Sequence, residues 1–159
     1  PMPTALRPSC STIMTQDERF YQYDHWFENE AMQEANMKYY YDQVTGEFDK
    51  VLAEHGYVRD GHYYRVEKAN NDTLVFFCHF GLGCVLISHL LSMSPMVLWH
   101  NLCAAPSSVT TLTSEERRKG IAGFRMNSYG DISHLYAHDE PPAFAARFCE
   151  CYDNDERHD

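Results

Sequence analysis

Apolar residues recur at every third or fourth position between residues 17 and 55, and this spacing predicts amphipathic helix over that stretch. The apolar positions are Met32, Ala35, Tyr39, Val44, Phe48, Val51 and Leu52. Gly56 follows directly and is typical of the residue that ends a helix. Residues 59–72 contain the turn signals Asp-Gly and Asn-Asn, so we expect a hairpin-like or irregular connection there.

A continuous apolar run at residues 73–78, "TLVFFC", predicts a strand that is covered on both faces. The residues after His79 are apolar at helical spacing and predict a helix that ends before Ser94-Pro95. Further along, the pattern predicts a short helix at 95–103, a β-branched strand at 107–113, a charged turn at 114–120, an antiparallel return strand at 121–131 and a closing helix at 141–153. This order of elements indicates an α/β fold with a mixed sheet.

The composition places the chain among ordinary globular proteins. Its 159 residues fit a single domain, with residues 1–16 as an irregular lead-in. The net charge of −10 argues against a nucleic-acid partner, because such proteins carry a basic face. No apolar stretch is long enough to span a membrane, and the six cysteines form no C-x-x-C pair. We therefore expect a cytoplasmic protein with reduced thiols and no membrane association.

His79 is the residue that points to chemistry, because it stands where the predicted strand gives way to a helix. Ligands of open α/β sheets gather at the carboxyl ends of strands, and a helix N-terminus favours anions. The main-chain N–H groups of Phe80, Gly81 and Leu82 would face the same ligand as the imidazole, and glycine permits a close approach. These residues indicate a pocket for phosphate or carboxylate. The alternative is a core histidine whose hydrogen bonds are satisfied at a strand end.

Three segments in order resemble the histidine phosphatase superfamily, whose members have a phosphoglycerate mutase-like fold. They are "LVFFCHFGLGCVLISHLL", "SSVTTLT" and "NSYGDISHL", and the resemblance covers residues 48–135. It implies a three-layer α/β fold with a mostly parallel sheet and phosphoryl transfer through a phosphohistidine. His79 then matches the family's second histidine, which binds the phosphoryl oxygens, with Phe80 and Gly81 beside it. Cys78 and Phe80 depart from the small residues that are usual there.

The nucleophile that the resemblance implies, the histidine of an Arg-His-Gly motif, does not occur in the sequence. His55 in "EHG" is a poor substitute, because it ends a predicted helix and Glu54 precedes it. Glu18 and Glu28 lie in the approximate region of the general acid, and nothing in their spacing selects either one. The chain therefore resembles the C-terminal portion of such a phosphatase, without its first strand, and we expect it to be inactive alone.

Two functional hypotheses follow. The first is a phosphomonoester phosphatase or phosphotransferase that acts on a small phosphorylated substrate without a metal or other cofactor. The second is a catalytically inactive, phosphatase-like fragment that binds anions or a protein partner. Without a neighbouring strand, the predicted strand before His79 would expose an apolar edge. Its partner would be a missing N-terminal half or a second copy of the chain.

Other candidate residues carry weaker signals. The resemblance gives His134 and Ser133 a structural role, with His134 hydrogen-bonded so that it holds the return strand. Arg117 or Arg118 could contact a phosphate, but a solvated turn is the simpler interpretation, and His100 beside Trp99 is an isolated histidine. Cys78, His79 and Cys84 are metal-ligand types, but Cys78 and His79 would point to opposite faces of a strand, so we expect no metal site.

Overall fold

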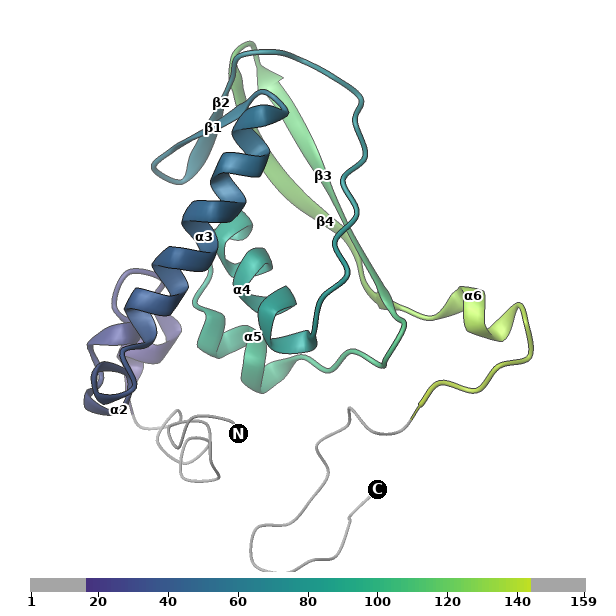
Figure 1. Ribbon diagram of the computed structural model, residues 1–159, viewed down its shortest axis with the longest axis horizontal. Helices are drawn as coiled ribbons and strands as arrows, with labels where there is room; N and C mark the ends of the chain where they lie inside the picture. Colours follow the sequence, from purple (N-terminus) through teal and green to yellow (C-terminus); the bar gives the residue numbers. More distant parts are fainter. Residues whose placement is uncertain (1–16, 144–159) are drawn as a thin grey trace, which may run out of the picture. The chain divides into compact units, whose positions relative to one another are not determined.

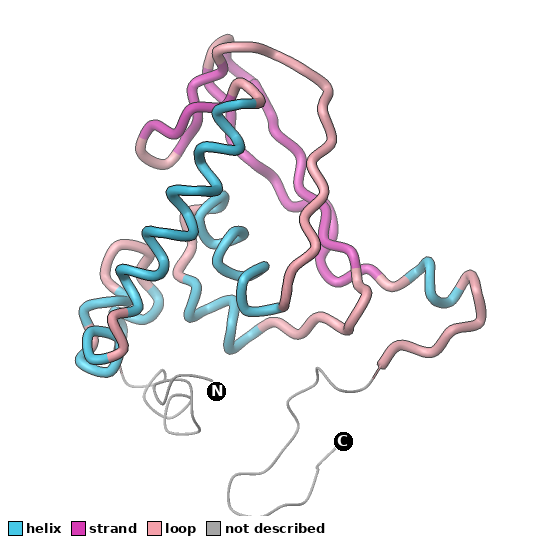
Figure 2. The backbone as a smooth tube through the Cα atoms, in the orientation of Figure 1, coloured by secondary structure: helices cyan, strands magenta, loops and turns pink. Residues whose placement is uncertain are grey.

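A computed structural model describes residues 17–143, which contain helices and one antiparallel sheet of four strands, a mixed α/β composition (Figures 1 and 2). The helices are the 3-10 helices η2 (Glu18–Tyr21) and η3 (Trp26–Glu28), and the α-helices α2 (Glu30–Glu34), α3 (Met37–Glu54), α4 (Phe80–Leu91), α5 (Pro95–Asn101) and α6 (Ser133–Tyr136). The strands are β1 (Tyr57–Asp60), β2 (Tyr63–Val66), β3 (Val109–Arg118) and β4 (Ile121–Asp131).

The described residues belong to two compact units. The first comprises residues 17–101 and 114–125, and the second comprises residues 102–113 and 126–143. The expectation of one domain over residues 1–159 stays a prediction. The lead-in at residues 1–16 and most of the closing helix at 141–153 lie outside the described residues.

The predicted helical stretch at residues 17–55 is confirmed only in part, because it is divided into η2, η3, α2 and α3. Tyr39, expected on the apolar face, is 53% exposed. Within the long helical stretch, α3 buries Thr45, Phe48 and Leu52 on one face and ends at Glu54. Gly56 then adopts a φ of +87°, the left-handed conformation that ends a helix, so the predicted stop is confirmed. The two helices predicted around Ser94-Pro95 are confirmed as α4 and α5.

Two hydrophobic clusters form the core of the first unit. Phe20, Trp26, Met32 and Met96 make one cluster, where η2, η3 and α2 meet α5. Phe48, Leu52 and Tyr64 make the other, with Leu74, Leu86, Leu90 and Phe124 packed against it. The second cluster joins one face of α3 and α4 to the sheet, because burying these apolar surfaces against one another removes them from water.

The four strands form one sheet in the order β1-β2-β4-β3. Tyr57 of β1 pairs with Val66 of β2, and Tyr64 of β2 pairs with Ala122 of β4, both in antiparallel register. β3 and β4 are consecutive neighbours joined by a short turn, which is also an antiparallel hairpin. The expected mixed or mostly parallel sheet is therefore not what the described strands form.

The reason lies in residues 73–78, which the sequence pattern assigned to a buried strand. The structure gives them no strand pairing, and they run as a connection between β2 and α4. A strand exists only beside a neighbour that shares its main-chain hydrogen bonds, and these residues have no such neighbour among residues 17–143. The prediction of a strand ending at His79 is therefore wrong for the described chain, and Cys78, expected to be buried, is exposed.

The predicted charged turn at residues 114–120 is also wrong in extent. β3 continues to Arg118, and the turn comes only at Lys119 and Gly120, where Gly120 has a φ of +81°. Glu115 lies 2.9 Å from Arg117 and 3.0 Å from Arg125 of the opposite strand. Charged side chains are tolerated in this hairpin because they point to solvent and pair across the strands.

Candidate functional site

His79 is the N-cap of α4 and is exposed to solvent. Its backbone is extended, with φ −76° and ψ 156°, and its carbonyl accepts the first helical hydrogen bond from Gly83 N–H at 2.9 Å. The imidazole makes no capping hydrogen bond to the helix. The ring is therefore not the satisfied core histidine of the alternative interpretation, and it stands beside the first turn of a 12-residue helix.

The main chain that follows His79 is open to solvent on one side. A Cβ atom added at Gly81 would meet nothing within 4 Å, and Leu82 is 40% exposed. The first N–H groups of a helix have no partner inside it, and no hydrogen bond of Gly81 N–H or Leu82 N–H is present among the described residues. The Gly81 carbonyl accepts a hydrogen bond of 3.0 Å from Trp99 Nε1, which fixes this helix end against α5. An exposed imidazole and first-turn amides thus share one corner, which we call the His79 corner (His79, Phe80, Gly81 and Leu82).

This corner can bind an anion through hydrogen bonds and the partial positive charge of the helix end. None of the ion pairs of residues 17–143 brings a lysine or arginine to it. No group of three or more His, Cys, Asp or Glu that could hold a metal ion occurs in the described part of the chain. The chemistry available here is therefore hydrogen bonding and proton transfer by one imidazole.

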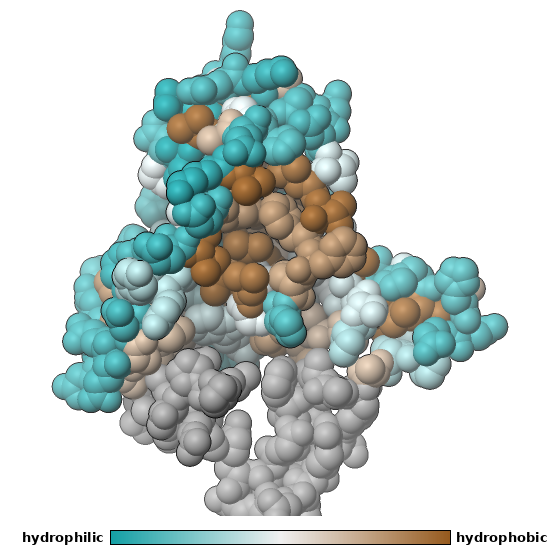
Figure 3. All heavy atoms as spheres, in the orientation of Figure 1, coloured by the Kyte–Doolittle hydropathy of each residue, from teal (hydrophilic) through white to brown (hydrophobic). Residues whose placement is uncertain are grey.

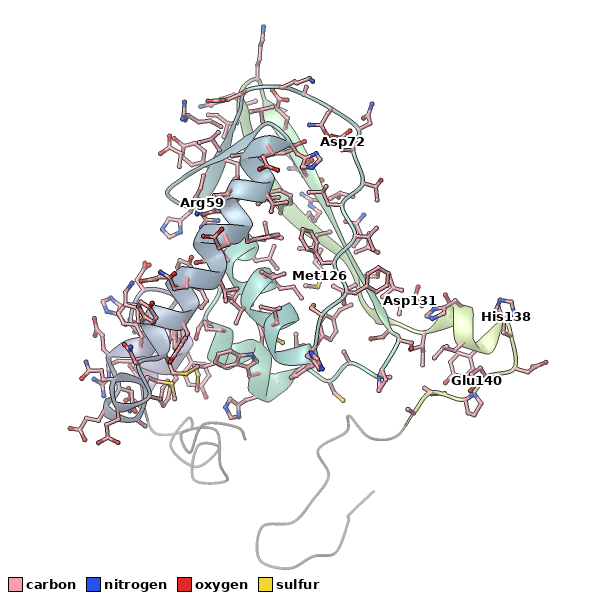
Figure 4. All side chains as sticks on the ribbon, viewed as in Figure 1. Arg59, Asp72, Met126, Asp131, His138 and Glu140 are labelled. Atoms are coloured by element: carbon pink, nitrogen blue, oxygen red, sulfur yellow. The ribbon has the colours of Figure 1, made fainter. Side chains whose placement is uncertain are left out.

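The other candidate residues do not gather at His79. His55 caps the C-terminal end of α3 and lies 2.8 Å from Asp72, at the far end of the connection that leads to His79 (Figure 4). Glu18 is exposed in η2, and Glu28 pairs with His25 at 2.9 Å. Neither glutamate has a described contact with His79. The structure therefore brings neither the substitute nucleophile nor a general acid to the corner.

Arg117, Arg118 and His100 likewise join the corner through no described polar contact. Arg117 and Arg118 are exposed near the end of β3, and His100 is exposed in the last turn of α5. Burial of part of its ring nonetheless lowers the pKa of His100. None of the three has a described hydrogen bond or ion pair with residues 79–82.

His134 and Ser133 lie on α6 in the second unit. Ser133 donates from both its N–H and its hydroxyl to the Asp131 carboxylate, at 2.8 Å and 3.2 Å. These bonds lower the pKa of Asp131. His134 is exposed and has no hydrogen bond among the described residues, so the bond expected to hold the return strand is not present there. Asp131, the last residue of β4, is hydrogen-bonded to Ser133 instead.

Sequence reasoning missed a polar network inside the first unit. His89 of α4 is buried, and its Nε2 donates to both carboxylate oxygens of Asp49 on α3, at 2.9 Å each. The Nδ1 atom of His89 lies 3.3 Å from the hydroxyl of Tyr23. A carboxylate only accepts, so this pairing assigns the Nε2 proton of the imidazole. The signal in the sequence is His89 itself, a single polar ring in an apolar helix that needs a buried partner.

Arg59 extends this network from β1 (Figure 4). Its Nη1 donates to the Tyr64 hydroxyl at 2.9 Å and to the His89 carbonyl at 2.7 Å, and Nη2 lies 3.3 Å from Ser92 Oγ. The Tyr64 hydroxyl lies 3.4 Å from Asp49. Burial raises the pKa of Tyr64, against the opposing effect of Arg59. The network therefore joins α3, α4 and the first hairpin by polar contacts.

No protein family, curated protein or solved structure gives a significant match to this chain. The function must therefore be argued from its own residues. No helix among residues 17–143 combines the length and the apolar character needed to cross a membrane.

Proposed function

We propose that the His79 corner binds a phosphoryl group, and that the chain is part of a phosphomonoester phosphatase or phosphotransferase of the histidine phosphatase type. The observation that carries the proposal is the exposed His79 imidazole at the N-terminus of α4, with no capping bond, beside an open main chain at Gly81. A phosphate oxygen there can accept from the imidazole and from first-turn N–H groups together.

The resemblance supports the same function from the sequence. It gives the residue at His79 the task of holding phosphoryl oxygens while charge moves during transfer. The proposal extends to the fold, in which α4 would belong to a three-layer arrangement around a mostly parallel sheet. Small phosphorylated molecules are the substrate class that we propose for this corner.

A second candidate function is phosphate binding without turnover. It is favoured by the lack of an Arg-His-Gly motif in the 159 residues and by the pairing of His55 with Asp72. Phosphohistidine chemistry needs a nucleophilic imidazole within reach of the bound phosphorus. A chain without one would bind the phosphoryl group and stop there.

Titration with inorganic phosphate tests the proposal. We expect the backbone amide resonances of Gly81 and Leu82 to shift in ¹H–¹⁵N spectra of the full chain. His79→Ala should weaken binding by about tenfold, because a hydrogen bond to a charged group contributes about 1.5 kcal/mol or more. His138→Ala removes an exposed histidine of the second unit and should leave the titration unchanged.

Turnover of p-nitrophenyl phosphate separates the two functions. Turnover that is lost in His79→Ala and kept in His138→Ala would support the enzyme. Phosphate-dependent shifts without turnover would support binding alone. If phosphate leaves the Gly81 and Leu82 resonances unmoved, or if both alanine variants titrate like the natural chain, the His79 corner is not a phosphate site.

A further inference from the structure

The connection that leads to His79 exposes apolar side chains and an unpaired main chain. Val75 is 68% exposed, Phe76 46% and Phe77 96%. Residues 73–78 make no hydrogen bond, main-chain or side-chain, to any described residue. Apolar side chains gather on the face of the molecule seen in Figure 3. Six consecutive residues without a charge therefore present both apolar surface and free backbone donors and acceptors to solvent.

The side chains of this segment alternate in the manner of a strand. Leu74 packs against the cluster of Phe48, Leu52 and Tyr64, and the Phe76 ring meets Phe48 edge-on with the ring centroids 5.3 Å apart. Val75 and Phe77, at the intervening positions, are the more exposed residues. Successive side chains of a strand point to opposite faces, so one face of the segment is already seated on the core. The opposite face and the hydrogen-bonding edge are uncovered.

We propose that residues 73–78 are a docking edge for one extended, apolar segment of a partner protein, which adds to them as a β-strand. Main-chain hydrogen bonds supply affinity in such strand addition, and side chains at alternate positions supply specificity. The segment "TLVFFC" is continuously apolar. A strand of this kind favours an apolar strand as its neighbour. This binding surface directly precedes the His79 corner in the chain, but its argument does not use phosphate binding.

Charge and area both favour a strand over a second copy of the chain. Two copies would each bring a net charge of −10 to the contact, whereas a neutral or basic segment would meet no repulsion. Taking about 200 Å² for a whole aromatic side chain, the exposed parts of Phe76 and Phe77 amount to roughly 300 Å², and Val75, 68% exposed, adds less than one such side chain. An interface between two globular proteins buries about 800 Å² on each partner, so this patch alone is too small for one.

The test uses the full ¹⁵N-labelled chain and a synthetic peptide, acetyl-Lys-Thr-Val-Ile-Val-Thr-Lys-amide. Without peptide, the amides of residues 74–78 should exchange with solvent almost as fast as in an unfolded chain, because they have no hydrogen bond. With peptide, alternate amides should become protected, since those facing one edge bond to the added strand. A version of the peptide with proline at its centre should not bind, because it lacks the required donor.

A matched pair of variants locates the surface. Phe77→Asp should weaken peptide binding at least about tenfold, because a carboxylate would be buried by the added strand. Phe77 is 96% exposed in the chain without peptide. The unfolding midpoint of the Phe77→Asp variant should therefore hardly differ from that of the natural chain. Val109→Asp alters another exposed apolar residue, on β3, and should leave peptide binding unchanged.

Two results would overturn the proposal. One is a peptide that leaves these amides unprotected or binds equally to Phe77→Asp. The other is protection of the same amides without peptide in a sample whose mass by light scattering is twice that of one chain. The second result would make another copy the occupant.

Discussion

Replacing Asp49 with alanine should lower the free energy of unfolding of the first unit by about 2 kcal/mol, in the range for a buried donor that loses its acceptor. The carboxylate accepts from His89 Nε2 through both oxygens, and the two side chains are only 9% and 24% exposed for His89 and Asp49. Removing the carboxylate leaves the imidazole N–H buried without an acceptor, and an unsatisfied buried donor is destabilising. Urea unfolding followed by tryptophan fluorescence measures the change, because Trp26 and Trp99 both lie in this unit.

Asp42→Ala is the matched control for this prediction. Asp42 lies on the same helix, and its ion pair with Lys38 is about half exposed on each side. Exposed pairs of this kind contribute about 0.5 kcal/mol or less, and alanine improves helix propensity equally at the two positions. A double-mutant cycle of Asp49→Ala with His89→Ala should give a coupling well above zero. Equal destabilisation by Asp49→Ala and Asp42→Ala would show that the buried pair stabilises the unit no more than the exposed pair does.

Gly56→Ala should destabilise the same unit by about 3 kcal/mol, combining about 1 kcal/mol for left-handed backbone with the strain of overpacking. Gly56 has a φ of +87°, and a Cβ atom there would clash with the main-chain carbonyl oxygen of Lys68. That oxygen cannot move without shifting the connection after β2. The same urea experiment reports the loss, as a lower midpoint without a change of slope.

Gly46→Ala should act in the opposite direction. Gly46 lies inside α3, and a Cβ atom there would meet nothing within 4 Å. Alanine in a helix interior is more stable than glycine by about 0.5 to 1 kcal/mol. If both substitutions shift the midpoint in the same direction, the left-handed conformation at residue 56 is not the one described.

The sequence predicted the local part of the candidate site, but not its surroundings. It placed His79 at the start of a helix with glycine behind it, and the structure has that arrangement. Its context was wrong, since the residues before His79 pair with no strand in the described chain. Whether His79 binds phosphate stays a prediction, because no residue of the described chain joins it to complete a catalytic set.

The polar network shows why such sites escape pattern analysis. Asp49 and His89 are 40 positions apart in the chain, and Arg59 comes from a third element. The helical spacing of α3 and α4 shows which face of each helix is apolar, but not which polar residues meet when the faces pack. Only the packed structure identifies Asp49, rather than the nearby Asp42, as the partner of His89.

The sequence alone determined those helices and turns whose position depends only on neighbouring residues in the chain. The burial of Phe48 and Leu52 on α3, its end at Gly56, the division between α4 and α5 at Ser94-Pro95 and the β3–β4 hairpin all follow from periodicity or from glycine and proline. The tertiary structure decided the pairing of β2 with β4, the extension of β3 through charged residues, and the exposure of residues 73–78. Helices form from hydrogen bonds within one segment, whereas a strand depends on a neighbour that its own sequence does not specify.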